Sequence, residues 1–170
     1  LPGFFRWLDA DKDGLMTGKE WTKIENWIGS FDWNNALIAL KPPTDKGGLP
    51  EVIWEYTHGV PECPSPIIIG DLIYMIKNGG IFTCLNAKTG ELQYDQKLEV
   101  GGPYYASPVY ADGKIFIAST RGIVSIVKEG SEFELISTND LNDRMMATPA
   151  LVEGQVVIRT HKALYKFGEK

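Results

Sequence analysis

From about residue 33 onward, short apolar runs alternate with polar turns in a pattern that repeats along the chain. Three segments share the pattern, and each begins with a Ser-Pro or Thr-Pro pair, at Ser65, Ser107 and Thr148. The spacing of about 42 residues is in the range of a four-stranded propeller blade. We name the four strands that the pattern predicts in each copy A to D.

The strand signals recur at matching places in the copies. Strand B reads "LIYMI", "KIFIA" and "QVVIR", and strand C reads "GIFTCL", "GIVSIV" and "ALYKF". Between strands A and B stand Gly70-Asp71, Asp112-Gly113 and Glu153-Gly154, which are residue pairs that tolerate the positive φ angles of two-residue hairpins. Each copy is therefore predicted to form an antiparallel meander.

The first and last copies are incomplete. "NNALIALKP" (34–42) and "EVIWEY" (51–56) match only strands C and D, whereas the last copy ends after strand C, at Phe167. The predicted fold class is all-β, a partial β-propeller of about three four-stranded antiparallel blades with a small helical insertion. Because open sheet edges invite pairing, we expect a C-terminal part of a larger propeller, with its edges covered by the remaining blades or by another copy.

The segment "DADKDGLMTGKE" (9–20) has the residue spacing of a calcium-binding loop. Calcium takes six to eight oxygen ligands, and positions 1, 3, 5, 7, 9 and 12 of such a loop supply them. Gly14 stands at position 6, where the chain must turn sharply. The predicted ligands are Asp9, Asp11, Asp13, the carbonyl of Leu15, Thr17 and Glu20.

Apolar residues at helical spacing flank this loop on both sides. Together the segments resemble an EF-hand, so residues 1–32 are predicted to form a helix-loop-helix insertion and residues 33–170 the blades. A partner hand upstream and a single hand packed on the sheet both remain open. Because the insertion precedes a strand C, we expect it on the face that carries the connections from strand B to C and from strand D to A.

Charge and apolar content argue against two kinds of partner, a nucleic acid and the interior of a membrane. The formal net charge of −5 and the absence of a basic cluster argue against nucleic acid. No apolar run is long enough to span a membrane, and the 170 residues carry no signal-peptide pattern. Cys63 and Cys84 are predicted to lie too far apart to bridge easily, and no cysteine–histidine cluster suggests zinc.

The run "LNAKTGELQY" (85–94) resembles the tryptophan-docking repeat of pyrroloquinoline-quinone-like (PQQ-like) β-propellers, with Tyr94 and Trp54 at the aromatic position. "VKEGSEFEL" in the next copy lacks the Thr-Gly pair and the aromatic residue. With the EF-hand, the chain resembles a group of secreted bacterial propeller proteins. This resemblance implies a periplasmic or extracellular location. Bound quinone is not expected, because no adjacent cysteines and no channel carboxylates can be assigned.

The connections from strand D to the next strand A carry side chains suited to a ligand or a protein partner. An alternative is that these side chains pack between the blades. The candidates are His58, Tyr104, Tyr105, Arg144, Met145 and Met146.

The function that we expect is a calcium-binding, non-catalytic propeller module that acts as a binding or scaffolding surface, with calcium in a structural role. Two alternatives remain open from the sequence. One is a fragment of a quinone-dependent dehydrogenase, and the other is a calcium-responsive sensor.

Overall fold

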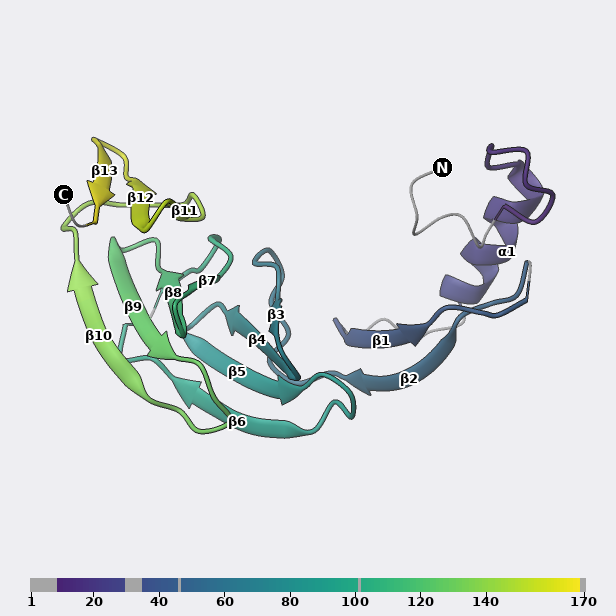
Figure 1. Ribbon diagram of the computed structural model, residues 1–170, viewed down its shortest axis with the longest axis horizontal. Coiled ribbons are helices and arrows are strands. Elements are labelled where there is room, and N and C mark those ends of the chain that lie inside the picture. The colour runs from purple at the N-terminus through teal and green to yellow at the C-terminus, as the bar shows by residue number, and fades with distance from the viewer. Residues whose placement is uncertain (1–8, 30–34, 46, 101, 169–170) are drawn as a thin grey trace. The chain divides into compact units, whose positions relative to one another are not determined.

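The structure is a computed structural model that describes residues 9–29, 35–45, 47–100 and 102–168 (Figure 1). Contacts divide the chain into two compact units, Leu1–Thr57 and His58–Lys170. The predicted boundary between residues 32 and 33 and the predicted helix before the calcium loop fall on residues outside the described part, and both stay predictions.

The second unit consists of three antiparallel sheets, two of four strands and one of three. In each sheet the strands follow one another in chain order, so the predicted meander and the all-β fold class are confirmed. The first sheet contains β3 (Ile67–Ile69), β4 (Leu72–Lys77), β5 (Ile81–Asn86) and β6 (Leu92–Lys97). The second contains β7 (Val109–Ala111), β8 (Lys114–Ala118), β9 (Ile123–Lys128) and β10 (Leu135–Asp140), and the third contains β11 (Ala150–Val152), β12 (Gln155–Arg159) and β13 (Leu164–Phe167).

The hairpin turns between strands A and B have the backbone geometry that their residues predict. Asp112 and Gly113 have φ angles of 50° and 71°, and Glu153 and Gly154 have 50° and 73°. Positive φ at both central residues matches the twist of the flanking strands, so these pairs close the hairpins without splaying them. These turns therefore set the register of strands A and B in the second and third sheets, whereas in the first sheet only Gly70 of the pair Gly70-Asp71 has a positive φ, of 57°.

A core between the first and second sheets holds the larger part of the second unit together. Its fully buried members include Tyr74 and Phe82 of the first sheet and Ile115, Ile117 and Val127 of the second. The Tyr74 hydroxyl accepts a hydrogen bond from the Gly130 N–H at 2.9 Å and donates to the Gly130 carbonyl at 3.2 Å. This contact joins the first sheet to the connection between β9 and β10.

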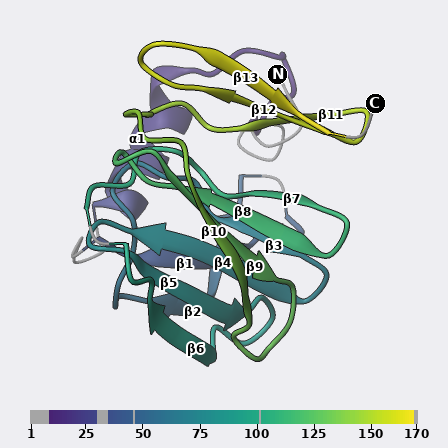
Figure 2. The same cartoon turned by 90° about the vertical axis from the view of Figure 1, so that its left-hand side faces the viewer.

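A smaller core lies between the second and third sheets. It contains Ala106, Ala118, Val124, Met145 and Ile158. Figure 2 shows β11–β13 alongside β7–β10.

The first unit contains the helix α1 (Gly18–Ile28) and a hairpin of β1 (Leu37–Lys41) and β2 (Glu51–Tyr56). The Thr17 side chain caps α1 in a reciprocal capping box with Glu20. Lys23 Nζ donates to the Gly47 carbonyl, in the connection between β1 and β2. These strands match strands C and D, so α1 lies beside a C–D connection. The D–A connections that define the expected face belong to the second unit, so the expectation that the insertion lies on that face stays a prediction.

Two further sequence predictions concern the cysteines and the membrane. Cys63 is exposed and Cys84 is buried, and neither forms a disulfide. Within the described ranges, no helix combines the length and apolar character that crossing a membrane requires.

Candidate functional site

The three aspartates at the start of the predicted calcium loop converge. One carboxylate oxygen each from Asp9, Asp11 and Asp13 lies within 4.8 Å of the others. Three carboxylates at this separation repel one another unless a cation lies among them. Their convergence gives three oxygen ligands of the kind that a hard cation such as calcium takes.

Hydrogen bonds within the loop bring the aspartates together. Asp11 Oδ1 accepts from the Asp13 N–H at 3.2 Å, and Asp13 Oδ1 accepts from the Leu15 N–H at 2.7 Å. Asp9 Oδ2 accepts from the Gly14 N–H at 2.9 Å, which ties position 1 to position 6. Gly14 has a φ of +81°, so a residue with a side chain would be strained at this sharp turn.

The burial of the Asp9 carboxylate bears on whether the loop fits a cation. Its side chain is 7% exposed, and its Oδ1 is a buried atom without a hydrogen-bond partner. A buried carboxylate oxygen without a partner costs free energy, and a bound cation would remove that cost. The donor set consists of oxygen atoms alone, so the residues present fit calcium.

In this structure both carboxylate oxygens of Glu20 accept hydrogen bonds from residues of the loop. Its Oε1 accepts from the Ala10 N–H at 2.7 Å, and its Oε2 accepts from the Thr17 N–H at 2.8 Å and hydroxyl at 2.7 Å. The hydrogen bond from the Thr17 side chain is the main reason that the pKa of Glu20 is lowered. Glu20 thus holds both ends of the loop, and coordination of a cation by it requires exchange of some of these bonds.

The predicted partner surface is only partly exposed. Tyr104 and Met145 are 1% and 2% exposed and belong to the two cores of the second unit. Burial raises the pKa of Tyr104 to about 12, and its hydroxyl donates to the Val100 carbonyl at 2.8 Å. These two side chains therefore pack between the sheets, as the alternative to a partner surface predicted.

The other candidates remain accessible. His58 and Arg144 are exposed, and Tyr105 and Met146 are 42% and 60% exposed. Arg144, Met145 and Met146 line a cavity of about 460 Å³. His58 and Tyr105 are not among the residues that line it.

Four lining residues of this cavity were not predicted as partner residues, and two of them, Arg159 and His161, carry side chains that can bind a polar partner. Arg159 ends β12 and His161 begins the turn to β13, and both are exposed. Asp143 Oδ2 accepts from the Lys162 N–H at 2.8 Å, and this hydrogen bond is the main reason that the pKa of Asp143 is lowered. The bond joins a D–A connection to a B–C turn. The sequence could have pointed to Arg159 and His161, because D–A connections and B–C turns are expected on the same face of a blade.

Among the comparisons with known proteins, those with solved structures identify the fold. No family model matches the sequence, and no curated protein matches it. BamB from Moraxella catarrhalis is similar with a TM-score of 0.63 and 18% identity, over 80% of this chain and 41% of BamB. The β-propeller domain of Cps50 (Swd1) from Myceliophteria thermophila gives 0.60 and 12%, over 80% and 50%.

These similarities identify the fold alone. The similar structures are β-propeller proteins, and this chain spans half or less of the length of each of the two. With open three- and four-stranded sheets in the second unit, the chain is a partial β-propeller. A quinohemoprotein alcohol dehydrogenase from Pseudomonas putida HK5 matches with a TM-score of only 0.49 and 15% identity, over 56% of this chain and 16% of the enzyme.

Proposed function

We propose that the chain is a calcium-binding, non-catalytic module of a PQQ-like β-propeller that acts as a binding or scaffolding surface. The observation that carries the calcium part is Asp9, whose buried Oδ1 lacks a partner beside the carboxylates of Asp11 and Asp13. The aspartates, the Leu15 carbonyl, Thr17 and Glu20 would hold the ion.

Calcium has a structural role in this proposal. The loop leads directly into α1, and α1 is attached to the β1–β2 connection through Lys23 and the Gly47 carbonyl. An ion that neutralises the three carboxylates would stabilise the loop and, through the helix, that connection. The periplasmic or extracellular location that the family resemblance implies would suit a weak site, because extracellular modules bind calcium with affinities near millimolar. Quinone is not part of the proposal.

The binding surface lies where D–A connections and B–C turns of the second and third sheets meet. The exposed residues that line the cavity there include Arg144, Met146, Arg159 and His161. Arg159 Nη1 also donates to the Thr160 carbonyl at 2.7 Å and to the Ala163 carbonyl at 3.2 Å. Guanidinium groups recognise carboxylates, and methionine adapts to irregular apolar partners. The surface therefore suits a protein partner that combines acidic and apolar side chains.

The test is the melting transition of the first unit in calcium and in chelator, repeated for Glu20→Gln. Tryptophan fluorescence follows this transition, because all five tryptophans lie in residues 1–57. At calcium concentrations about 100-fold above the dissociation constant, ligand binding should raise the melting temperature of this transition by at least about 5 °C. Glu20→Gln removes one ligand charge and should lose most of this shift. Glu25→Gln is the matched control, because it makes the same change on α1 outside the loop and should keep the shift.

Two results would contradict the proposal. If calcium does not shift the melting temperature of the unmodified chain, the loop is not a filled site. If calcium instead causes a large change in the radius of gyration at micromolar concentration, the chain is a sensor rather than a structural calcium protein.

A further inference from the structure

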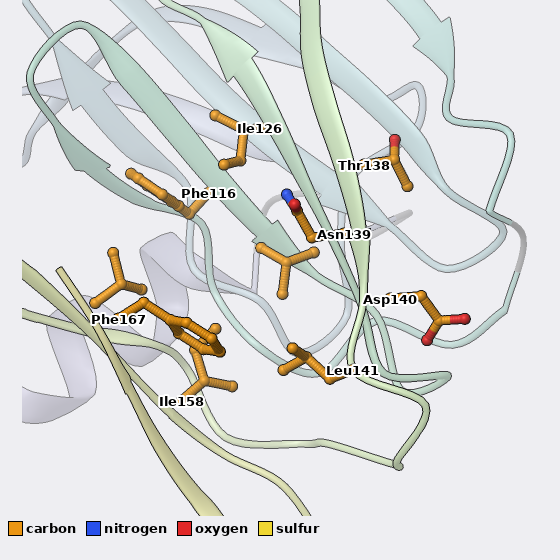
Figure 3. A pocket seen from close by; sticks show the side chains of 10 residues that line it. Phe116, Ile126, Thr138, Asn139, Asp140, Leu141, Ile158 and Phe167 are labelled. Carbon is orange, nitrogen blue, oxygen red and sulfur yellow. The ribbon is translucent and has the colours of Figure 1, made fainter.

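The cavities of the two units differ in what surrounds them. In the second unit, a groove of about 550 Å³ lies between the second and third sheets, with Phe116 and Ile126 on one side and Ile158 and Phe167 on the other (Figure 3). Nothing in the described part of the structure shows what covers these apolar side chains, so this groove carries no assignment. The first unit contains a smaller cavity of about 130 Å³, and residues of the calcium loop, α1 and the β1–β2 connection line it together.

One residue of the β1–β2 connection, Gly47, reaches the calcium loop. A Cβ atom added at Gly47 would lie 3.3 Å from the Cβ of Ala10, which is position 2 of the loop, so the glycine backbone packs directly on the loop. Gly47 has a φ of +66°, a conformation that glycine adopts without strain. Its carbonyl accepts a hydrogen bond from Lys23 Nζ on α1. We call the packing on Ala10 and the hydrogen bond from Lys23 the two Gly47 contacts.

Ala10 is also the residue at which the two ends of the loop meet. Its N–H donates to Glu20 Oε1 at 2.7 Å, which joins position 2 to position 12. Asp9, the first of the proposed ligands, directly precedes Ala10, and its side chain is buried. Because calcium takes ligands from both ends of such a loop, the ends must lie close together when the ion binds. Gly47 therefore packs on the part of the loop where the first and last ligands are brought together.

We propose that the two Gly47 contacts raise the affinity of the loop for calcium by holding its ends in place before the ion binds. Lys23 and Gly47 are then positioning residues and not ligands. A site that is already ordered loses less conformational freedom when it binds a ligand, and its affinity is higher for that reason. The inference rests on the proposed calcium role and adds that part of the affinity is set outside the twelve-residue loop.

The coupling must act in both directions. If the connection stabilises the calcium-binding form of the loop, calcium stabilises the connection by the same factor. Gly48, whose N–H donates to the Asp45 carbonyl at 3.1 Å, and Leu49 follow Gly47 in the connection. Calcium should therefore slow the hydrogen exchange of the Gly48 and Leu49 amides, and Lys23→Met should lose most of this slowing.

The charge of Lys23 and the hydrogen bond that it makes have opposite effects on calcium. An ammonium group repels a calcium ion in the neighbouring loop, so removal of the charge alone should tighten calcium binding slightly. Loss of the hydrogen bond to Gly47 should weaken it. Lys19 supplies the matched control, because it carries the same charge on α1 and lines the same cavity, and within the described residues its side chain makes no hydrogen bond to the connection.

The experiment is a titration of the whole chain with calcium chloride at constant ionic strength, followed by the amide chemical shifts of the loop. Lys23 is exposed, so the loss of its hydrogen bond in Lys23→Met should raise the dissociation constant by about twofold to fivefold. Lys19→Met should leave the dissociation constant unchanged or lower it by up to about twofold.

A second variant disturbs the Gly47 contacts without changing any charge. Gly47→Ala places a Cβ atom 3.3 Å from that of Ala10 at an unfavourable φ, and it should raise the dissociation constant at least about threefold. Gly113→Ala is the matched control, because it has a similar φ of +71° in the second unit and nothing within 4 Å of the added Cβ. Its dissociation constant should stay within about twofold of that of the unmodified chain.

Equal dissociation constants for Lys23→Met and Lys19→Met would overturn the inference, as would a Gly47→Ala variant that binds calcium like Gly113→Ala. In both cases the unmodified chain still binds calcium, so the proposed calcium role would stand. If the unmodified chain does not bind calcium, the proposed function fails and the inference fails with it. If tryptophan fluorescence shows that Gly47→Ala does not fold, the two lysine variants and the exchange of the Gly48 and Leu49 amides decide the question.

Discussion

Two side chains illustrate how much a single residue contributes to this protein. The Asp9 carboxylate is buried with one oxygen lacking a partner, and the Tyr74 hydroxyl is buried with both of its hydrogen bonds made to Gly130. Buried polar groups are costly when unpaired and stabilising when paired. Asp9 thus carries a cost that the proposed cation would remove, whereas Tyr74 makes a completed contact with the connection between β9 and β10.

We expect Tyr74→Phe to destabilise the chain by about 1–3 kcal/mol, because the partly buried Gly130 N–H would lose its acceptor. Tyr110→Phe is the matched control. Its hydroxyl donates to Glu129 at 2.6 Å, but its side chain is 40% exposed, so water can replace the bond at a cost below about 1 kcal/mol. Urea unfolding measures both changes, and equal values for the two variants would contradict the argument.

Burial also makes stability depend on alkaline pH. Burial is the main cause that raises the pKa of Cys84 from 9.0 to about 11 and the pKa of Tyr74 from 10.0 to about 12. Because the unfolded chain loses these protons first, the folded state binds more protons in this range and stability falls as pH rises. The melting temperature should therefore decrease from pH 9 to pH 12.

Tyr74→Phe supplies the control for this prediction. The variant lacks one of the buried groups whose pKa is raised, so its melting temperature should fall less steeply between pH 10 and pH 12 than that of the unmodified chain. A melting temperature that stays constant from pH 9 to pH 12 in the unmodified chain would show that these groups are not protected by folding.

At the scale of elements, the turns and connections of neighbouring sheets are packed against each other. Gly122, in the turn between β8 and β9, has a φ of +89°. A Cβ atom at this position would lie 2.2 Å from the Asp143 carbonyl oxygen, in the connection between β10 and β11. Glycine here permits both the backbone angle and the close approach.

We expect Gly122→Ala to destabilise the chain by more than about 2 kcal/mol, since it adds a clash with backbone to an unfavourable φ. Gly113→Ala is the matched control, with a φ of +71° and nothing within 4 Å of the added Cβ, so only the cost of the backbone angle, about 1–2 kcal/mol, remains. Guanidinium unfolding compares them, and a control as damaging as Gly122→Ala would show that crowding contributes nothing.

At the scale of the whole molecule, the chain consists of two compact units that differ in their secondary structure. The first contains the calcium loop, α1 and one hairpin, and the second contains the three sheets and both of the cores identified in them. Because the proposed calcium ligands all belong to the first unit, the effect of calcium on local stability should be confined to it.

Hydrogen exchange with and without calcium tests this expectation. Calcium should slow the exchange of amides in the loop and α1 by at least about tenfold, because local opening would then release the ion. Amides of β4, β5 and β9 in the second unit should keep their rates. Equal slowing in both units would indicate that calcium binding is coupled to the sheets and would support the sensor alternative.

The sequence by itself determined the features that depend on short-range pattern. The apolar–polar alternation and the turn pairs such as Asp112-Gly113 predict strands and hairpins locally, and repetition at one period predicts the propeller sheets. The aromatic position was predictable too, and the register confirms that Trp54 and Tyr94 are equivalent, each beside a bulge.

Only the tertiary structure decided which side chains are buried and which surfaces remain open. Tyr104 and Met145 look like partner residues in the sequence, but contacts with distant strands bury them. The partner of α1 and the groove beside Phe167 likewise depend on segments far apart in the chain. Local pattern sets backbone conformation, whereas burial is a property of packing between segments, so it becomes visible only when the sheets are assembled.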